Sequence, residues 1–300
     1  MIATLGRREW LGIVYGASAA IIWGGQLAMS RAGATSGLDG FDMAALRSGA
    51  AGLLLLPWLL TARRYGRGPG LTSWSHALVL AVAAGPLFIM ASMGGFHFAP
   101  LPHGAVLQPS AMVLASMALS ALLLRERLRA LRLIGAGIIV VGLCLIAGPA
   151  ILQGDRLTPI GDGLFLLAGA MFALYSALSR RWNVGPMQAT GAVTVIAGLV
   201  FMPFYLVLHG LDGLLALPLP MLLAQVIVQG LLTGIVSLVV FGRAVEILGA
   251  GRATLFPALA PVAAILIGIP LVGEIPTLAQ TLGLFIVTGG LVLSLGAGRS

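Results

Sequence analysis

Apolar residues fill most of this chain in long runs, and short polar segments separate them. A helix needs about 20 mostly apolar residues to cross the hydrocarbon core of a membrane. Ten runs come close to that length, and their predicted bounds are 11–30, 40–61, 74–96, 101–123, 131–149, 160–179, 187–208, 219–242, 250–272 and 277–297. The runs are about twice as long as a barrel strand and do not alternate, so the pattern favours an all-α membrane protein over a β-barrel.

Composition agrees with a chain whose solvent is the lipid bilayer. Only 9% of its 300 residues are charged and 59% are hydrophobic, whereas a soluble domain carries about 25% charged residues. The net charge is +8 and all 17 basic residues are Arg. They form short clusters between apolar runs, which is typical of loops at a membrane surface, so no nucleic-acid partner is expected. The single cysteine, Cys144, lies in an apolar run, so neither a disulfide framework nor a thiolate metal site is expected.

The arginines predict the orientation of the chain. The apolar stretch behind MIATLGRREW is too long for a cleaved signal, so it is taken as a retained first span. On the side of the N-terminus lie Arg7, Arg8, Arg63, Arg64, Arg67, Arg125, Arg127, Arg129, Arg132, Arg180, Arg181, Arg243, Arg252 and Arg299. On the other side lie Arg31 and Arg156, with Arg47 near the start of the second span. Cytoplasmic loops are enriched in basic residues, so both termini are expected in the cytoplasm, for a protein of a bacterial-type inner membrane.

The chain also repeats itself. Residues 103–148 align without a gap on 251–296, at an offset of 148 positions. The identities include Ala105/Ala253, Leu107/Leu255, Pro109/Pro257, Ala115/Ala263, Glu126/Glu274, Gly135/Gly283, Gly142/Gly290 and Gly148/Gly296. Spans one and six align at 149, and spans two and seven at 146. We therefore predict two five-helix halves, residues 1–150 with spans 1–5 and residues 151–300 with spans 6–10.

An odd number of spans per half inverts the second half across the membrane. The paired Glu126 and Glu274 should then face opposite sides. Inverted repeats are the architecture of secondary transporters, which bind substrate near the membrane midplane where the repeats meet. The repeat thus predicts a transporter built around a central cavity.

Several short segments resemble a known family. They are AAIIWGG in span one, MAALRSGAAGLLLL in span two, the LLLRERL that follows Pro109, and PALAPVAAILIGIPLVGEIPT in span nine. With these the chain resembles the drug/metabolite transporter superfamily over nearly its whole length, and in particular the EamA-type ten-helix exporters. It looks most similar to the YddG-type amino-acid exporters. The resemblance implies export of amino acids or related small metabolites by alternating access, without ATP.

The stretches VLQPSAMV and TLFPALAP each place a proline inside a span, at Pro109 and Pro257. Proline removes a backbone hydrogen bond, and in lipid the freed carbonyl must find a partner or face a cavity. We interpret both as helix breaks bordering the substrate cavity, where Gln108 offers an amide and Phe256 an apolar wall. The alternative is a kink that only improves packing, with Gln108 bonded to a neighbouring helix. Under the first interpretation Gln108→Ala should change transport more than folding.

Further candidates for the substrate site share the expected depth. They are Trp23 and Gln26 in span one, Phe88 and Met90 in span three, Phe172 and Tyr175 in span six, and Gln229 and Thr233 in span eight. Trp23 pairs with Phe172 at the offset of 149, as Gln26 does with Tyr175. For any single aromatic residue ordinary packing is the favoured explanation of its position. The polar positions of span eight suit a cavity, although hydrogen bonding between helices would also account for them.

Charge within the spans is sparse, and this bears on the substrate and on coupling. Arg47 is expected to pair with Asp42 or to reach outward, and His97 and His103 are expected to be structural. Without a buried carboxylate placed to relay protons, facilitated export is the simplest prediction. Because the arginines are expected at span ends, a neutral or zwitterionic amino acid, aromatic or otherwise apolar, is favoured.

Other function classes remain as alternatives. The chain could export other metabolites or drugs, or could be an intramembrane enzyme or a membrane protein that transports nothing. The sequence contains no HExxH, no paired aspartates and no serine with a nearby base, so no catalytic residue and no cofactor are expected. We expect a monomer in the bilayer that binds a small molecule.

Overall fold

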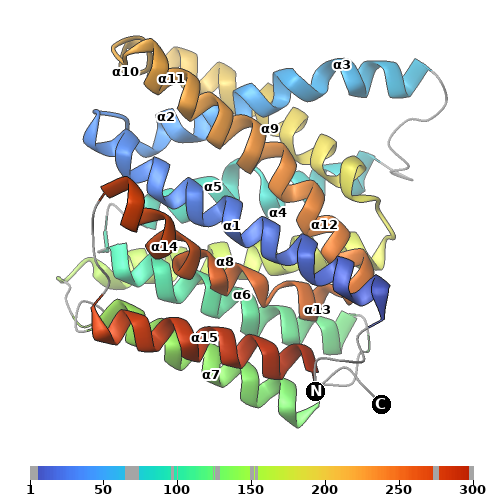
Figure 1. Ribbon diagram of the computed structural model, residues 1–300. Helices are drawn as coiled ribbons and strands as arrows, with labels where there is room; N and C mark the ends of the chain where they lie inside the picture. The colour runs from blue at the N-terminus through green and yellow to red at the C-terminus, as the bar shows by residue number, and fades with distance from the viewer. Residues whose placement is uncertain are drawn as a thin grey trace.

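The protein is a bundle of helices (Figure 1). The computed structural model describes residues 6–64, 74–95, 98–99, 101–123, 125, 129–148, 152, 155–272 and 277–296, and every regular element in that part of the chain is helical. Nine helical stretches there are long and apolar enough to cross a membrane. The stretch that corresponds to the second predicted span, Gly40–Arg64, is helical but divided into three segments. The expected all-α architecture is confirmed.

The bounds of the elements follow the predicted spans closely. Spans one to five are α1 (Arg7–Thr35), α2 (Gly40–Ala45) with η1 (Leu46–Ala50) and α3 (Ala51–Arg64), α4 (Trp74–Ala84) with α5 (Pro86–Gly94), α6 (Leu101–Leu123) and α7 (Ala130–Ala147). Spans six to ten are α8 (Thr158–Arg181), α9 (Pro186–Leu208), α11 (Leu219–Gln225) with η4 (Val226–Val236) and α12 (Ser237–Leu248), α13 (Ala250–Ala253) with η5 (Phe256–Leu259) and α14 (Ala260–Val272), and α15 (Leu278–Gly296). The short α10 (Asp212–Leu215) precedes α11.

Two of these spans contain widened, π-helical turns, η1 and η4. A π-turn adds a residue to the helical turn and shifts the direction of the side chains around it, and such turns are frequent at functional sites. The two segments pack against each other, and a Cβ on Gly230 would lie 2.5 Å from the Cβ of Ala50. The centre of the bundle is therefore built from irregular helix in both halves.

Helix contacts follow the internal repeat. The fifth and tenth spans, α7 and α15, pack along their length through glycines that the offset of 148 relates. Gly135 faces Gly290, and Gly142 faces Gly283; a Cβ at any of the four would lie within 2.9 Å of a backbone atom of the other helix. Each contact is thus the image of the other, as expected for repeats related by a two-fold axis.

The axis itself passes between the second and seventh spans. Gly52 and Gly198 approach so closely that a Cβ on either would lie about 3.5 Å from the Cα of the other. The same Cβ on Gly52 would lie 3.1 Å from the carbonyl oxygen of Thr194, and that on Gly198 would lie 3.0 Å from the carbonyl oxygen of Ser48. Ser48 and Thr194 are 146 positions apart, as are the two glycines. The two-repeat architecture is therefore present in the packing as well as in the sequence.

The two prolines behave differently, which corrects the expectation of two equivalent breaks. α6 continues through Pro109 from Leu101 to Leu123. Pro257 lies in the short 3-10 turn η5, between α13 and α14. Proline fits the first turn of a helical segment because its missing N–H would have no partner there, so the chain divides cleanly at Pro257. Of the two spans that contain Pro109 and Pro257, only the ninth is broken.

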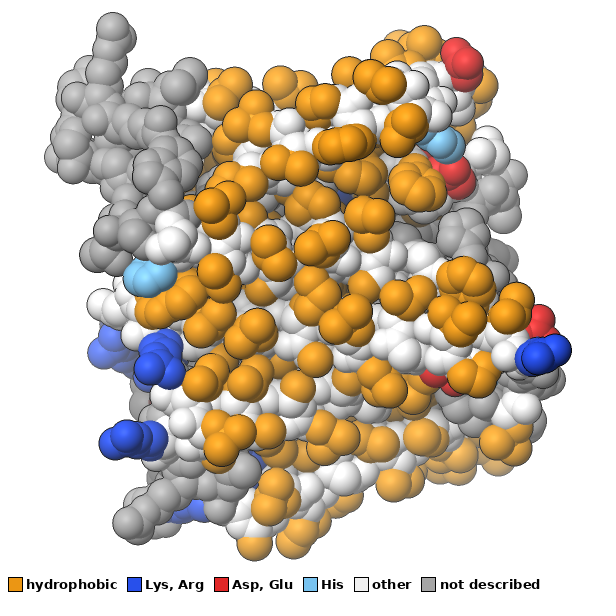
Figure 2. All heavy atoms as spheres, turned by 180° about the vertical axis from the view of Figure 1, so that it is seen from behind, with side chains coloured by type: hydrophobic (Ala, Val, Ile, Leu, Met, Phe, Trp, Pro, Cys, Tyr) orange, Lys and Arg blue, Asp and Glu red, His pale blue; other side chains and the backbone are white. Residues whose placement is uncertain are grey.

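The outer surface and the ends of the bundle agree with a membrane protein. Hydrophobic side chains cover the face shown in Figure 2, with basic side chains gathered mainly at one end and most acidic ones toward the other. Exposed apolar residues include Leu53, Leu122, Val207 and Phe285. The start of α1 and the end of α15 lie at the same end of the bundle (right in Figure 1).

Candidate functional site

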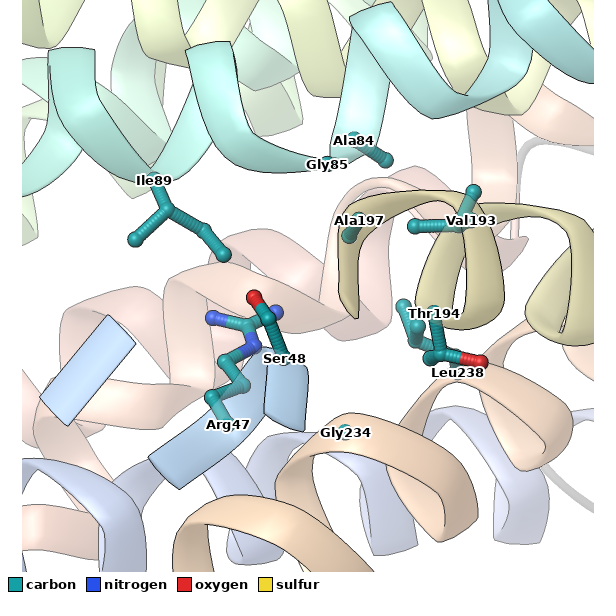
Figure 3. A pocket seen from close by; sticks show the side chains of 10 residues that line it. All are labelled: Arg47, Ser48, Ala84, Gly85, Ile89, Val193, Thr194, Ala197, Gly234 and Leu238. Atoms are coloured by element: carbon teal, nitrogen blue, oxygen red, sulfur yellow. The ribbon is translucent and has the colours of Figure 1, made fainter. Parts of the chain in front are cut away.

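A small cavity lies where the two halves meet (Figure 3). It has room for the centre of about one water molecule. Its wall is formed by Arg47, Ser48, Ala84, Gly85, Ile89, Val193, Thr194, Ala197, Gly234 and Leu238. These residues come from spans two, three, seven and eight, so each half contributes two helices.

The wall of the cavity is arranged in repeat-related pairs. Ser48 and Thr194, at the offset of 146, line it from opposite halves. Spans three and eight add Gly85 with Gly234 and Ile89 with Leu238, at an offset of 149. The cavity therefore lies on the two-fold axis that passes between Gly52 and Gly198.

One pair breaks the symmetry of the cavity. Arg47 has Val193 as its counterpart at the offset of 146, and both line the wall. The first half thus brings a permanent positive charge to a position where the second half brings an aliphatic side chain. Arg47 lies in η1, seven residues after the start of α2 and so about 10 Å along the span at 1.5 Å per residue.

The surroundings of Arg47 correct the expectation that it pairs with Asp42 or reaches outward. Its guanidinium carbon lies 6.0 Å from the centroid of the Phe88 ring, in the range of a cation–π contact. No carboxylate of the described part of the chain forms an ion pair with it. Asp42 instead accepts a hydrogen bond of 2.6 Å from the Tyr205 hydroxyl. The view that all arginines stay at span ends, on which the preference for a neutral or zwitterionic substrate depended, is therefore wrong for Arg47.

Five aromatic rings form what we term the aromatic cluster, namely Trp23, Phe88, Phe172, Tyr175 and Phe241 from α1, α5, α8 and α12. Phe88 is the member of the cluster that lies beside Arg47. Phe172 is its centre, with the other four ring centroids 5.3 to 5.8 Å away. The edge-to-face pair of Trp23 and Phe172 joins residues that the repeat relates. Four of the twelve residues expected at the site are thus brought together. Phe241 was not among the candidates, although it lies four residues after Ser237 and so continues the spacing of Gln229 and Thr233 along the same span.

The amide of Gln108 faces a neighbouring helix. It accepts a hydrogen bond of 2.8 Å from the hydroxyl of Ser92 at the end of span three. Its backbone carbonyl lies against Gly169, where α6 and α8 pack closely. Both Gln108 and Pro109 are partly buried, and Gln26 of α1 is 8% exposed.

Two glutamines of span eight link helices, which corrects the preference for a cavity at these positions. Gln229 donates to the Ser30 hydroxyl at 2.9 Å, and Gln225 donates to the carbonyl of Met29 at 2.8 Å. Thr233, although fully buried, is not among the residues that line the cavity. Gln225 and Gln229 therefore fasten span eight to the end of α1, as the alternative interpretation held, whereas the Thr233 hydroxyl has no hydrogen-bond partner within the described residues.

Three remaining candidates lie apart from the aromatic cluster. Phe256 and Pro257 are buried in a second hydrophobic core formed largely by spans four, five, nine and ten, where the Phe256 ring lies against Gly16. Met90 is 48% exposed on the outer surface. Glu126, Glu274 and His97 lie outside the described residues, and His103 is held by Asp162 of α8 at 2.8 Å.

The chain matches the model of a known protein family in both of its halves. The family model described as "EamA-like transporter family" matches it twice, over residues 10–148 and 159–296. The chain belongs to the EamA-like transporter family. The two matches correspond to the two halves of the bundle, each with five spans.

A solved structure supports the fold of this EamA-like transporter. A chain titled only "Crystal structure of protein" is 18% identical, with a TM-score of 0.72, over 94% of this chain and 96% of its own. No sequence among the curated proteins matches closely enough to count as a relative. Family membership makes the protein a multi-pass membrane transporter of small molecules in the drug/metabolite superfamily.

Proposed function

We propose that this transporter exports amino acids, with apolar or aromatic ones preferred, by alternating access and without ATP. The observation that carries the proposal is the aromatic cluster, which lies beside the cavity on the two-fold axis. Aromatic rings bury large apolar area and bind apolar side chains well. An amino acid is small enough for a site that opens between helices of both halves.

Alternating access requires that the two ends of the bundle open in turn, and different contacts close each end. At the end away from the termini, the Tyr205 hydroxyl of α9 bonds to Asp42 of α2 at 2.6 Å. At the end of the termini, the ring of His76 in α4 stacks on Trp182 after α8, with centroids 3.9 Å apart. Both contacts join the first half to the second, so rocking one half against the other would break one and keep the other.

The proposed orientation says which end of the bundle opens to which side of the membrane. With both termini in the cytoplasm of a bacterial-type inner membrane, the end that carries His76 and Trp182 faces the cytoplasm. Transport is proposed to be facilitated by the substrate gradient, since no carboxylate is among the described residues that line the cavity. Other small metabolites or drugs are the alternative substrates.

Efflux from proteoliposomes tests the proposal. Vesicles would be loaded with labelled phenylalanine, leucine, glutamate or lysine, with and without a pH gradient. We expect saturable efflux of phenylalanine and leucine, unchanged by the gradient. Phe172→Ala should lower that efflux at least about ten-fold because it removes the centre of the aromatic cluster.

Phe285→Ala provides the matched control, since Phe285 is 72% exposed on the outer surface. It should leave efflux within about two-fold of the unmodified protein. Absence of flux of all four amino acids, from protein shown to be folded, would contradict the proposal. Flux that needs the pH gradient would replace facilitation by antiport.

A further inference from the structure

We infer that Arg47 and Ser48 form the carboxylate-binding subsite of this transporter, so that a carboxylate is the substrate group it requires. The inference rests on the proposed function and adds which group of the substrate is recognised, and by which residues. It begins from the charge of Arg47. Arginine stays charged in proteins, and a charged side chain inside a membrane is costly unless it is paired or hydrated.

The missing partner of Arg47 must come from outside the described part of the protein. Asp42, the nearest acid in sequence, is engaged by Tyr205 at 2.6 Å and by the backbone N–H of Asp39 at 3.1 Å. None of the ten residues that line the cavity is acidic. A guanidinium at the wall of such a cavity is suited to receive an anion that enters and leaves.

Ser48 supplies a second, independent observation. Ser48 is 3% exposed, and its hydroxyl oxygen has no hydrogen-bond partner within the described residues. In Figure 3 the hydroxyl points to the same side as the guanidinium of Arg47, toward Ile89. A buried hydroxyl without a partner costs free energy, which a bound acceptor would recover. One carboxylate can accept from both groups, because the guanidinium fork donates two parallel hydrogen bonds and leaves lone pairs free.

The opposite wall sets the direction in which a ligand would extend. The repeat-related Val193 is apolar, and the hydroxyl of Thr194 already donates to the carbonyl of Thr190 at 2.8 Å. The ring of Phe88 lies beside Arg47 and continues to Phe172 at 5.4 Å. A carboxylate at Arg47 and Ser48 would therefore place its apolar group along Phe88, toward the aromatic cluster.

The test compares ligands that share one apolar group. Phenylalanine, 3-phenylpropionate and phenethylamine differ in carrying both charged groups, only the carboxylate or only the amine. Binding to the full-length purified protein in detergent would be measured by calorimetry, with inorganic phosphate as a further probe. Phenylalanine and 3-phenylpropionate should bind, and phenethylamine should bind at least about ten-fold more weakly, because it lacks the charge-assisted hydrogen bonds.

Variants assign the effect to the two residues. Arg47→Gln should weaken phenylalanine binding at least about ten-fold and remove the difference from phenethylamine, whereas Arg47→Lys should retain part of the binding as a point charge. Ser48→Ala should weaken it less, by about three-fold or more. Arg181→Gln is the control. It removes an exposed arginine at the end of α8, away from the cavity lining, and should leave binding unchanged.

The melting temperature without ligand separates this proposal from a structural function of Arg47. If Arg47 only held helices together, Arg47→Gln would lower the melting temperature. As an unpaired charge in the membrane, its removal should leave that temperature equal or higher. The inference would be overturned if Arg47→Gln bound phenylalanine as tightly as the unmodified protein, or if phenethylamine bound as tightly as phenylalanine. It would also be overturned if the protein bound inorganic phosphate but neither phenylalanine nor 3-phenylpropionate. Binding that depends on Arg47 but gives no flux of amino acids would instead count against the proposed function alone.

Discussion

Asp42 shows how a single buried residue can be misassigned from sequence. It precedes Arg47 by five positions, so an ion pair along the helix was a reasonable expectation. The capping box at the start of α2 instead turns its Oδ2 back to the N–H of Asp39, while Oδ1 accepts from Tyr205, 163 positions away. The capping box and Tyr205 thus orient the carboxylate of Asp42 away from Arg47.

Removing the Tyr205 hydroxyl tests this contact. Tyr205→Phe should lower the free energy of unfolding by about 1–3 kcal/mol because the buried carboxylate of Asp42 loses a donor. The change would appear in thermal unfolding of the purified protein in detergent. Tyr15→Phe is the control, since Tyr15 makes no hydroxyl hydrogen bond within the described residues and its variant should unfold at the unchanged temperature. Equal effects of both substitutions would show that the bond to Asp42 contributes nothing specific.

Among the helices, α7 and α15 show most clearly what glycine does in this fold. Without a hydrophobic force between helices in lipid, close approach of backbones provides the contact, and small residues permit it. The repeat places Gly135 and Gly142 on one helix against Gly290 and Gly283 on the other. Neighbouring Gly137 and Gly289 have open space where a Cβ would lie.

Substitutions on the two faces of these helices should therefore differ sharply. Gly135→Val should cost about 1–3 kcal/mol by overpacking, since its Cβ would lie 2.7 Å from the carbonyl oxygen of Gly290. Gly137→Ala should leave stability unchanged or slightly raised, because alanine favours helix. Urea unfolding in micelles measures both variants. A loss for Gly137→Ala as large as for Gly135→Val would contradict the assigned helix faces.

The positions of the spans could be predicted from the sequence, but the breaks within them could not. Span positions followed from apolar length alone, and the repeat followed from matching prolines and glycines, so the fold was available from the sequence. The two prolines nevertheless gave one continuous helix and one break. What separates them is where each falls in its helix, with Pro257 at the start of the short turn η5 and Pro109 well inside α6. The matching prolines in the two repeats do not show which of them lies at the start of a helical segment.

At the scale of the whole molecule, the aromatic residues of the site could be predicted from the sequence, and its polar residues, Arg47 and Ser48, could not. Trp23 and Phe172 were visible as a repeat-related pair, and they touch. Arg47 was hidden because the side chain of a residue near a span start usually reaches outward to water. Here the π-turn η1 directs it to the cavity instead, and the turn has no signature in the sequence. The boundary between the halves at residues 150 and 151 stays a prediction, as does the monomeric state.

The orientation of the whole protein can be tested with two single cysteines. Cys144 is exposed and would first be replaced by alanine. In right-side-out vesicles a membrane-impermeant maleimide should then label Ser36→Cys and spare Arg181→Cys, with the reverse in inverted vesicles. Both positions are exposed and lie at opposite ends of the bundle. Labelling of Arg181→Cys from outside would place the termini outside the cytoplasm and contradict the proposed orientation.

The unequal pair of Arg47 and Val193 on the two-fold axis has a consequence for how such a protein can arise. In a dimer of two identical five-helix chains, every residue at the axis occurs twice. An arginine there would face its own copy, and the two like charges would repel across a cavity with room for about one water molecule. Joining the copies in one chain removes that restriction, because each half can then mutate alone. A single cation at the axis thus requires two unlike halves, which the fused chain provides and a dimer of identical chains does not.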